Sequence, residues 1–298
     1  MSEQNPPSAM SSPSSPLLLS TKFADALTKV ERVINALKEE GIECGPSSSL
    51  GSLFAKLRHL NNQHARDPAG YDLKRFFTSI EALWIAESLE MAIGEPGSRE
   101  PIRRIVGSDM SLSGRQLSQG KDALWELDLY RRLKLGGAKV RLDEPDLVIE
   151  LGNGLGSYGV ACKKVYSESG VVDAFEYGCR QLKGQGLPGV VAFNLDDLME
   201  EKALLHAPTS EALHRELVRR GQKFLTRHAA AFQKMIEREQ CDGVLISISM
   251  VSEVPDGLLP ITLARVPMLY PGPGGIRAPA KNRLEVFQQW IDRAASQK

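Results

Sequence analysis

Three short runs of β-branched and apolar residues, separated by turns of a few residues, constrain the fold of this chain more than any other feature. The runs cover residues 139–142, 147–151 and 158–165. Because parallel strands need a crossover of about a dozen residues or more, these turns can join only antiparallel neighbours. A helix at 171–182 and a buried strand at 189–193 follow. The pattern predicts an α/β fold with a mixed sheet flanked by helices.

The rest of the carboxyl-terminal part continues this alternation. A helix at 122–135, ended by Gly136 and Gly137, precedes the three runs. Further elements are expected at 210–239 (helix), 243–249 (strand), 265–270 (edge strand) and 284–295 (helix).

The amino-terminal part has a different texture. Residues 1–20 are rich in Ser and Pro and are expected to form a disordered tail. Apolar residues at three- and four-residue spacing then predict helices at 23–41, 50–60 and 72–93. The predicted organisation is a tail at 1–20, a helical domain at 21–95, a connecting segment at 96–120 and an α/β domain at 121–298. The apolar stripes of the helical domain are expected to form core or an interface with a second copy or a partner protein.

Composition limits the class of protein. The chain has 298 residues, and its 37 Lys and Arg balance 37 Asp and Glu. This neutrality argues against indiscriminate binding of polyanions through excess positive charge. The four Cys are scattered without a Cys-x-x-Cys pair, and no stretch approaches the ~20 apolar residues of a membrane helix. A cytoplasmic protein without a membrane segment is expected.

Three features within 121–164 carry the candidate chemistry. Glu126 lies in the first helix of the α/β part, Pro145-Asp146 opens the second strand, and Ala161-Cys-Lys163 lies on the third. Residues 161 and 163 share one face of their strand because strand side chains alternate. This order resembles the PD-(D/E)xK nuclease superfamily over about residues 121–270.

The resemblance implies a restriction-endonuclease-like fold and hydrolysis of phosphodiester bonds in DNA, in restriction, repair or defence. It implies a Mg²⁺ (or Mn²⁺) ion held by Asp146 and Glu126, since hard cations prefer carboxylate oxygens. Lys163 would orient the attacking water or stabilise negative charge on the phosphate.

One position departs from the family pattern. Ala161 stands where the family has Glu or Asp, and an alanine cannot ligate a metal. One explanation is a carboxylate that has migrated to the following helix, where Glu176 is the candidate catalytic residue and metal ligand. The alternative is an inactive nuclease fold that binds nucleic acid or protein.

A second motif supports a different class. The run Leu147 to Gly156 resembles the first motif of S-adenosylmethionine-dependent methyltransferases, whose glycines let a loop approach the cofactor. That fold requires a helix directly after the glycines. Asn153-Gly154 is also a strong hairpin signal, which favours two antiparallel strands instead.

Each candidate also has a purely structural interpretation. Glu176 precedes Arg180 by one helical turn, so the two can form an intrahelical ion pair. Lys163 and Lys164 would then be a solvated pair. Arg215, Arg219 and Lys223 share a helix face that is either a solvated surface or a phosphate contact.

Overall fold

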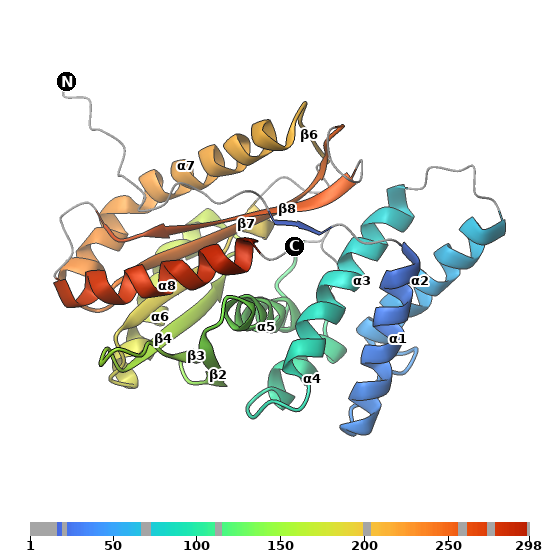
Figure 1. Ribbon diagram of the computed structural model, residues 1–298, viewed down its shortest axis with the longest axis horizontal. Helices are drawn as coiled ribbons and strands as arrows, with labels where there is room; N and C mark the ends of the chain where they lie inside the picture. The colour runs from blue at the N-terminus through green and yellow to red at the C-terminus, as the bar shows by residue number, and fades with distance from the viewer. Residues whose placement is uncertain are drawn as a thin grey trace.

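The computed structural model of the protein is built around one mixed sheet with helices on both faces (Figure 1). Seven strands follow the order β1-β8-β7-β5-β4-β3-β2, and β6 pairs with β7. The structure describes residues 17–19, 23–66, 73–110, 115–198, 204–255, 261–272 and 278–296. The strands are β1 Leu17–Leu19, β2 Lys139–Asp143, β3 Asp146–Glu150, β4 Ser157–Lys164, β5 Gly189–Asn194, β6 Leu205–His206, β7 Gly243–Glu253 and β8 Ile261–Tyr270. The predicted α/β class is confirmed.

The strand directions follow from the lengths of the connections. β2, β3 and β4 form the predicted antiparallel meander, in which Leu147 pairs with Val160. Helix α6 then separates β4 from β5, and these strands are parallel, with Val160 opposite Val190. β5 and β7 are also parallel, whereas β7 and β8 are antiparallel.

The glycine-rich connection between β3 and β4 is a hairpin loop. Its backbone is left-handed at Gly152, Asn153 and Gly154, where φ is 73°, 50° and 76°. Glycine and asparagine tolerate this region, which explains their use here. β4 follows as an antiparallel strand, so the helix that the methyltransferase motif requires does not follow these glycines.

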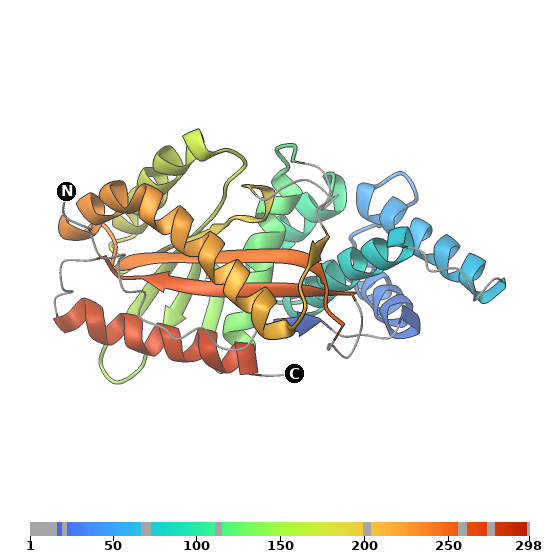
Figure 2. The ribbon, with the colours of Figure 1, turned by 90° about the horizontal axis from the view of Figure 1, so that it is seen from above.

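Helices cover both faces of the sheet. They are α1 Phe23–Glu39, α2 Ser49–Arg66, α3 Leu73–Ala92, α4 Arg99–Gly107, α5 Gln119–Leu135, α6 Val171–Gly184, α7 Ser210–Glu237 and α8 Ala278–Ser296. Buried side chains of α5 and α8 join one apolar core, and those of α6 and α7 join the core on the other face. Figure 2 shows α7 crossing the long strands β7 and β8.

The amino-terminal helices share a core with the sheet. α1 to α4 gather beside the sheet in Figure 1, and α3 and α4 pack against α5. Leu89, Ile105 and Leu127 lie in the same continuous core as Leu147. The predicted boundary near residue 120 therefore falls between two helices, α4 and α5, and the apolar core is continuous across it.

Three elements, α4, β1 and the short strand β6, lie where the sequence indicated none. α4 forms within the expected connecting segment, and its Pro101 lies in the first helical turn, where the missing N–H costs no hydrogen bond. β1 pairs with β8 inside the expected tail, with Leu18 opposite Ala264. The rest of residues 1–20 lies outside the described residues. None of the helices that the structure describes combines the length and apolarity needed to cross a bilayer.

Candidate functional site

Glu126, Asp146 and Lys163 come from three elements and lie near the amino end of β3, where Lys163 contacts Asp146 and Asp146 acts electrostatically on Glu126. Glu126 lies on α5, which is anchored to the sheet because Trp125 Nε1 donates to the carbonyl of Ala192 at 2.9 Å. Asp146 is the first residue of β3, and Lys163 is the penultimate residue of β4. The antiparallel pairing of β3 with β4 brings the last two residues together despite the hairpin between them.

Asp146 is held by the neighbouring strand. β3 begins at Asp146, while β4 runs on to Lys164. The Asp146 carboxylate therefore takes the place of a backbone carbonyl of β3 as a hydrogen-bond acceptor for β4. Asp146 Oδ2 accepts from the Cys162 N–H at 2.6 Å and from Lys163 Nζ at 3.3 Å. Burial raises the pKa of Asp146, while Lys163 and the Cys162 N–H oppose this rise. The carboxylate is thus fixed in position and partly desolvated.

Lys163 lies between this carboxylate and an exposed aromatic ring. Its Nζ donates to the Cys162 carbonyl at 2.7 Å and lies 5.4 Å from the ring centroid of Tyr177. Tyr177 is 53% exposed, and the Arg180 guanidinium approaches the same ring at 5.8 Å. The candidate site is therefore bordered by an exposed aromatic ring between two cations.

Glu126 forms a bidentate ion pair with an arginine that the sequence analysis did not single out. Arg104 Nη2 donates to Glu126 Oε2 at 2.9 Å, and Nη1 donates to Oε1 at 3.3 Å. Burial, and then the negative charge of Asp146, raise the pKa of Glu126 to about 7, although Arg104 and Lys163 act against this rise. Glu126 and Asp146 thus interact electrostatically.

Packing explains the alanine at 161. Its side chain is fully buried in the core beneath α6. α6 approaches the sheet through Gly178, where an added Cβ would lie 2.9 Å from Val191 Cγ1 and 3.4 Å from the Ala161 methyl. A carboxylate at 161 would have to enter this apolar contact. The family's usual acidic side chain is therefore sterically and electrostatically unsuited to this position.

Glu176 lies outside the cluster. Its side chain is 45% exposed, and Oε2 lies 3.9 Å from Arg180 Nη1, which confirms the intrahelical ion pair. Among the described residues, no group of three or more His, Cys, Asp and Glu side chains could hold a metal ion. The structure brings Lys163 into contact with Asp146 and places both within electrostatic range of Glu126, whereas the contact of Glu176 is with Arg180.

The carboxylates of Asp146 and Glu126 suit Mg²⁺ or Mn²⁺ if water and substrate phosphate supply the other ligands. Mg²⁺ commonly takes one or two carboxylates and completes its shell with water and substrate phosphate. Asp146 and Glu126 offer two carboxylates within a largely buried setting, with side chains 17% and 12% exposed. Each already contacts a cation, Lys163 or Arg104. The residues fit a metal ion if an oxygen is released from these pairs.

A second polar cluster lies at the carboxyl end of β5. Lys164 Nζ contacts Asp197 at 2.7 Å and Asn194 Oδ1 at 2.6 Å, and both side chains of the ion pair are 6% exposed. Asp196 accepts from the backbone N–H of Ser249 at 2.6 Å. The interpretation of Lys164 as a solvated cation is therefore wrong. Alternation along β4 places it and Lys163 on opposite faces of the sheet.

The cations of the α7 stripe are largely paired on their own helix. Arg215 Nη1 contacts Glu211 at 2.5 Å, and Arg219 contacts Glu216 at 2.8 Å. Such pairs are typical of a solvated helix face. The stripe therefore offers less uncompensated charge for phosphate than the sequence alone indicates.

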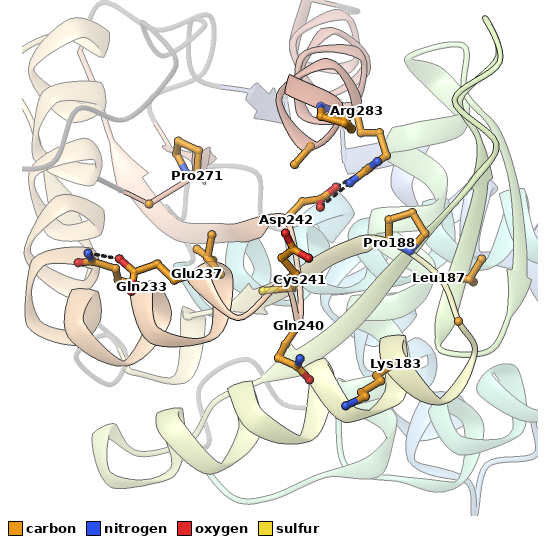
Figure 3. A pocket seen from close by; sticks show the side chains of 16 residues that line it. Lys183, Leu187, Pro188, Gln233, Glu237, Gln240, Cys241, Asp242, Pro271 and Arg283 are labelled. Carbon is orange, nitrogen blue, oxygen red and sulfur yellow. Dashed lines mark hydrogen bonds and ion pairs between the residues drawn. The ribbon is translucent and has the colours of Figure 1, made fainter. Parts of the chain in front are cut away.

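A cavity of about 730 Å³ opens elsewhere, near the amino ends of β5 and β7 (Figure 3). Arg283 and Asp242 line it and form an ion pair, at 2.7 and 2.8 Å. Cys241 and Lys183 also line it, but Glu126, Asp146, Lys163 and Glu176 do not. The cavity is thus separate from the carboxylate cluster.

Comparison of the chain with protein-family models, with curated proteins and with solved structures finds no match.

Proposed function

We propose that the protein is a metal-dependent nuclease that hydrolyses phosphodiester bonds in DNA, with a restriction-endonuclease-like core formed by α5, the β2-β3-β4 meander, α6 and β5. The observation that carries the proposal is the contact of Lys163 with Asp146 at the amino end of β3, within electrostatic range of Glu126. The charge of Asp146 raises the pKa of Glu126, so two buried carboxylates share one electrostatic environment. Such perturbed carboxylate pairs cluster at functional sites.

Each residue has a role that its surroundings support. Asp146 and Glu126 would hold Mg²⁺ or Mn²⁺ through carboxylate oxygens. The bound ion would supply charge neutralisation at the scissile phosphate and a lowered pKa for the attacking water. Lys163 Nζ donates to Asp146 and to the Cys162 carbonyl, which leaves its third N–H for a water molecule or a phosphate oxygen.

The surroundings of Lys163 suit a nucleic-acid strand. A base can stack on an exposed aromatic ring whatever its sequence, and nearby cations attract the phosphate backbone. Tyr177 supplies such a ring, with Lys163 and Arg180 beside it. Substrate would thus approach the sheet along α6 and reach Asp146 past Tyr177.

A cleavage assay tests this proposal. Supercoiled plasmid and single-stranded DNA are incubated with Mg²⁺ or Mn²⁺ and with wild type, Asp146→Ala, Lys163→Ala or Glu126→Gln. We expect each variant to lose at least about a hundredfold in rate, as expected when a metal ligand or an electrostatic stabiliser is removed. Glu176→Gln is the matched control and should retain activity, because its carboxylate lies outside the cluster. Undiminished cleavage by Asp146→Ala and Lys163→Ala would refute the assignment.

A specific observation also favours the inactive alternative. Position 161 is filled by a buried methyl group, and both remaining carboxylates are paired with cations. An inactive protein of this fold would bind DNA through Tyr177, Lys163 and Arg180 without cutting it. DNA binding that Tyr177→Ala weakens, with no cleavage by any variant in either metal, would identify this function.

A further inference from the structure

The contact between Arg104 and Glu126 has a consequence for metal binding, and this inference rests on the proposed function. Both carboxylate oxygens of Glu126 accept from the guanidinium, at 2.9 and 3.3 Å. A bidentate pair of this kind is among the strongest side-chain contacts and has a fixed geometry. Glu126 is only 12% exposed, so little water competes for its oxygens.

Packing of α4 against α5 holds Arg104 in place. Ile102, Ile105 and Val106 of α4 are buried, and α4 packs against α5. The helices approach closely at Gly120, where an added Cβ would lie 2.9 Å from the Arg104 carbonyl oxygen. Arg104 is therefore presented to Glu126 by packing of the helices, and its neighbour Arg103 on the same helix is exposed.

A metal ion and the guanidinium would use the same oxygens. A divalent cation needs a carboxylate oxygen at about 2.1 Å, free of a competing donor along the same direction. Asp146 Oδ2 already accepts from Cys162 and Lys163, so Glu126 is the carboxylate whose release most directly completes a site. We propose that Arg104 competes with the metal ion for Glu126 and thereby sets the metal affinity of the site.

Arg104 would accordingly act as a positioning residue. In the metal-free protein it balances the charge of Glu126 and keeps its carboxylate oriented beside Asp146. Metal binding requires the guanidinium to release at least one oxygen, and the affinity of the site is reduced by the strength of the contact that is lost.

Direct binding of Mn²⁺, measured by the electron paramagnetic resonance of the free ion, tests the inference without any cleavage. We expect Arg104→Gln to bind Mn²⁺ about tenfold more tightly than wild type, a change equivalent to about 1.4 kcal/mol. Arg103→Gln is the matched control and should bind as wild type does. Arg104→Lys keeps the charge but loses the planar fork, so it should tighten binding by a smaller factor.

Two further variants separate competition from a general charge effect. Adding Arg104→Gln to Glu126→Gln should change Mn²⁺ affinity little, because the contested carboxylate is gone. A full tenfold tightening in that background would overturn the inference, since Arg104 would then act by charge alone. Thermal unfolding and circular dichroism identify any variant that fails to fold, and Arg104→Lys then serves in its place.

The two proposals fail differently. Equal Mn²⁺ affinity of wild type and Arg104→Gln, with binding still abolished in Asp146→Ala, would refute competition and leave the metal site intact. Mn²⁺ binding that Asp146→Ala does not reduce, or no binding by any variant, would refute the metal site and the inference together.

Discussion

Replacing Glu126 by glutamine measures how much the ionisation of this buried carboxylate lowers the free energy of unfolding. Glu126 is 12% exposed, and its pKa rises from 4.5 to about 7 because of burial and the charge of Asp146. Between these two pH values the unfolded chain has released the proton that the folded protein retains. The folded state then binds more protons, so its stability falls as pH rises.

The magnitude follows from the two pKa values. Each pKa unit is worth about 1.36 kcal/mol, so a rise from 4.5 to about 7 corresponds to about 3 kcal/mol. Stability associated with protonated Glu126 is present below about pH 4.5 and is lost as pH rises through about 7. Glutamine does not titrate, and its amide oxygen still accepts from Arg104.

Urea unfolding, followed by the fluorescence of Trp84, Trp125 and Trp290, measures this difference. The free energy of unfolding of Glu126→Gln, minus that of wild type, should increase by about 3 kcal/mol between about pH 4.5 and pH 8. Carboxylates that do not interact with Glu126 titrate in both proteins and cancel in the difference, whereas Asp146 is coupled to Glu126, so the difference reports on the pair.

A control variant should show the opposite sign. Hydrogen bonding to Lys134 lowers the pKa of Glu95, which is 34% exposed. Stability from Glu95 is therefore present above the unfolded pKa. The free energy of unfolding of Glu95→Gln, minus that of wild type, should decrease as pH rises. If the stability difference between Glu126→Gln and wild type did not change with pH, the electrostatic description of the site would be refuted.

Three further predictions concern the remainder of the structure. Ala161→Glu should destabilise the protein by more than about 3 kcal/mol in thermal unfolding and should not restore faster cleavage, because the new carboxylate enters apolar packing. If Ala161→Glu were as stable as wild type, the claim that the close approach of α6 at Gly178 excludes a carboxylate from position 161 would be refuted. Lys164→Met should cost about 3 kcal/mol in urea unfolding, since it leaves Asp197 buried with weaker compensation; a cost below about 1 kcal/mol would show that this pair is solvated. Burial and the charge of Glu43 raise the pKa of Cys44 to about 11, from 9.0. At pH 8 its thiolate population, and hence its rate of reaction with iodoacetamide, should be about a hundredfold below that of an unperturbed thiol; an unperturbed rate would refute this environment.

The short-range pattern of the sequence was sufficient for most of the fold. Alternation and turn residues predicted the meander, and Asn153-Gly154 predicted the hairpin that joins β3 to β4. The sequence did not predict α4, because the several Gly, Ser and Arg residues across 94–119 are typical of a connecting segment. Only its burial against α5 shows that proline occupies a first helical turn.

The candidate site was predicted in part. The spacing of Asp146 and Lys163 on adjacent strands was enough to expect their approach, and the structure places them 3.3 Å apart. Arg104 could not be predicted, because its partner lies 22 residues away on another helix. The burial of Lys164 depends likewise on Asp197, which a neighbouring strand brings to it. Contacts between elements, rather than propensities within them, decide these roles.

A crystal structure of the protein soaked with Mn²⁺, with anomalous scattering recorded to locate the ion, tests the central claim most directly. We predict a peak between the carboxylates of Asp146 and Glu126, with an oxygen of each about 2 Å away and with Arg104 withdrawn from at least one oxygen of Glu126. A crystal whose Mn²⁺ sites all lie elsewhere, with the bidentate contact between Arg104 and Glu126 intact, would contradict the claim that these carboxylates form a metal centre.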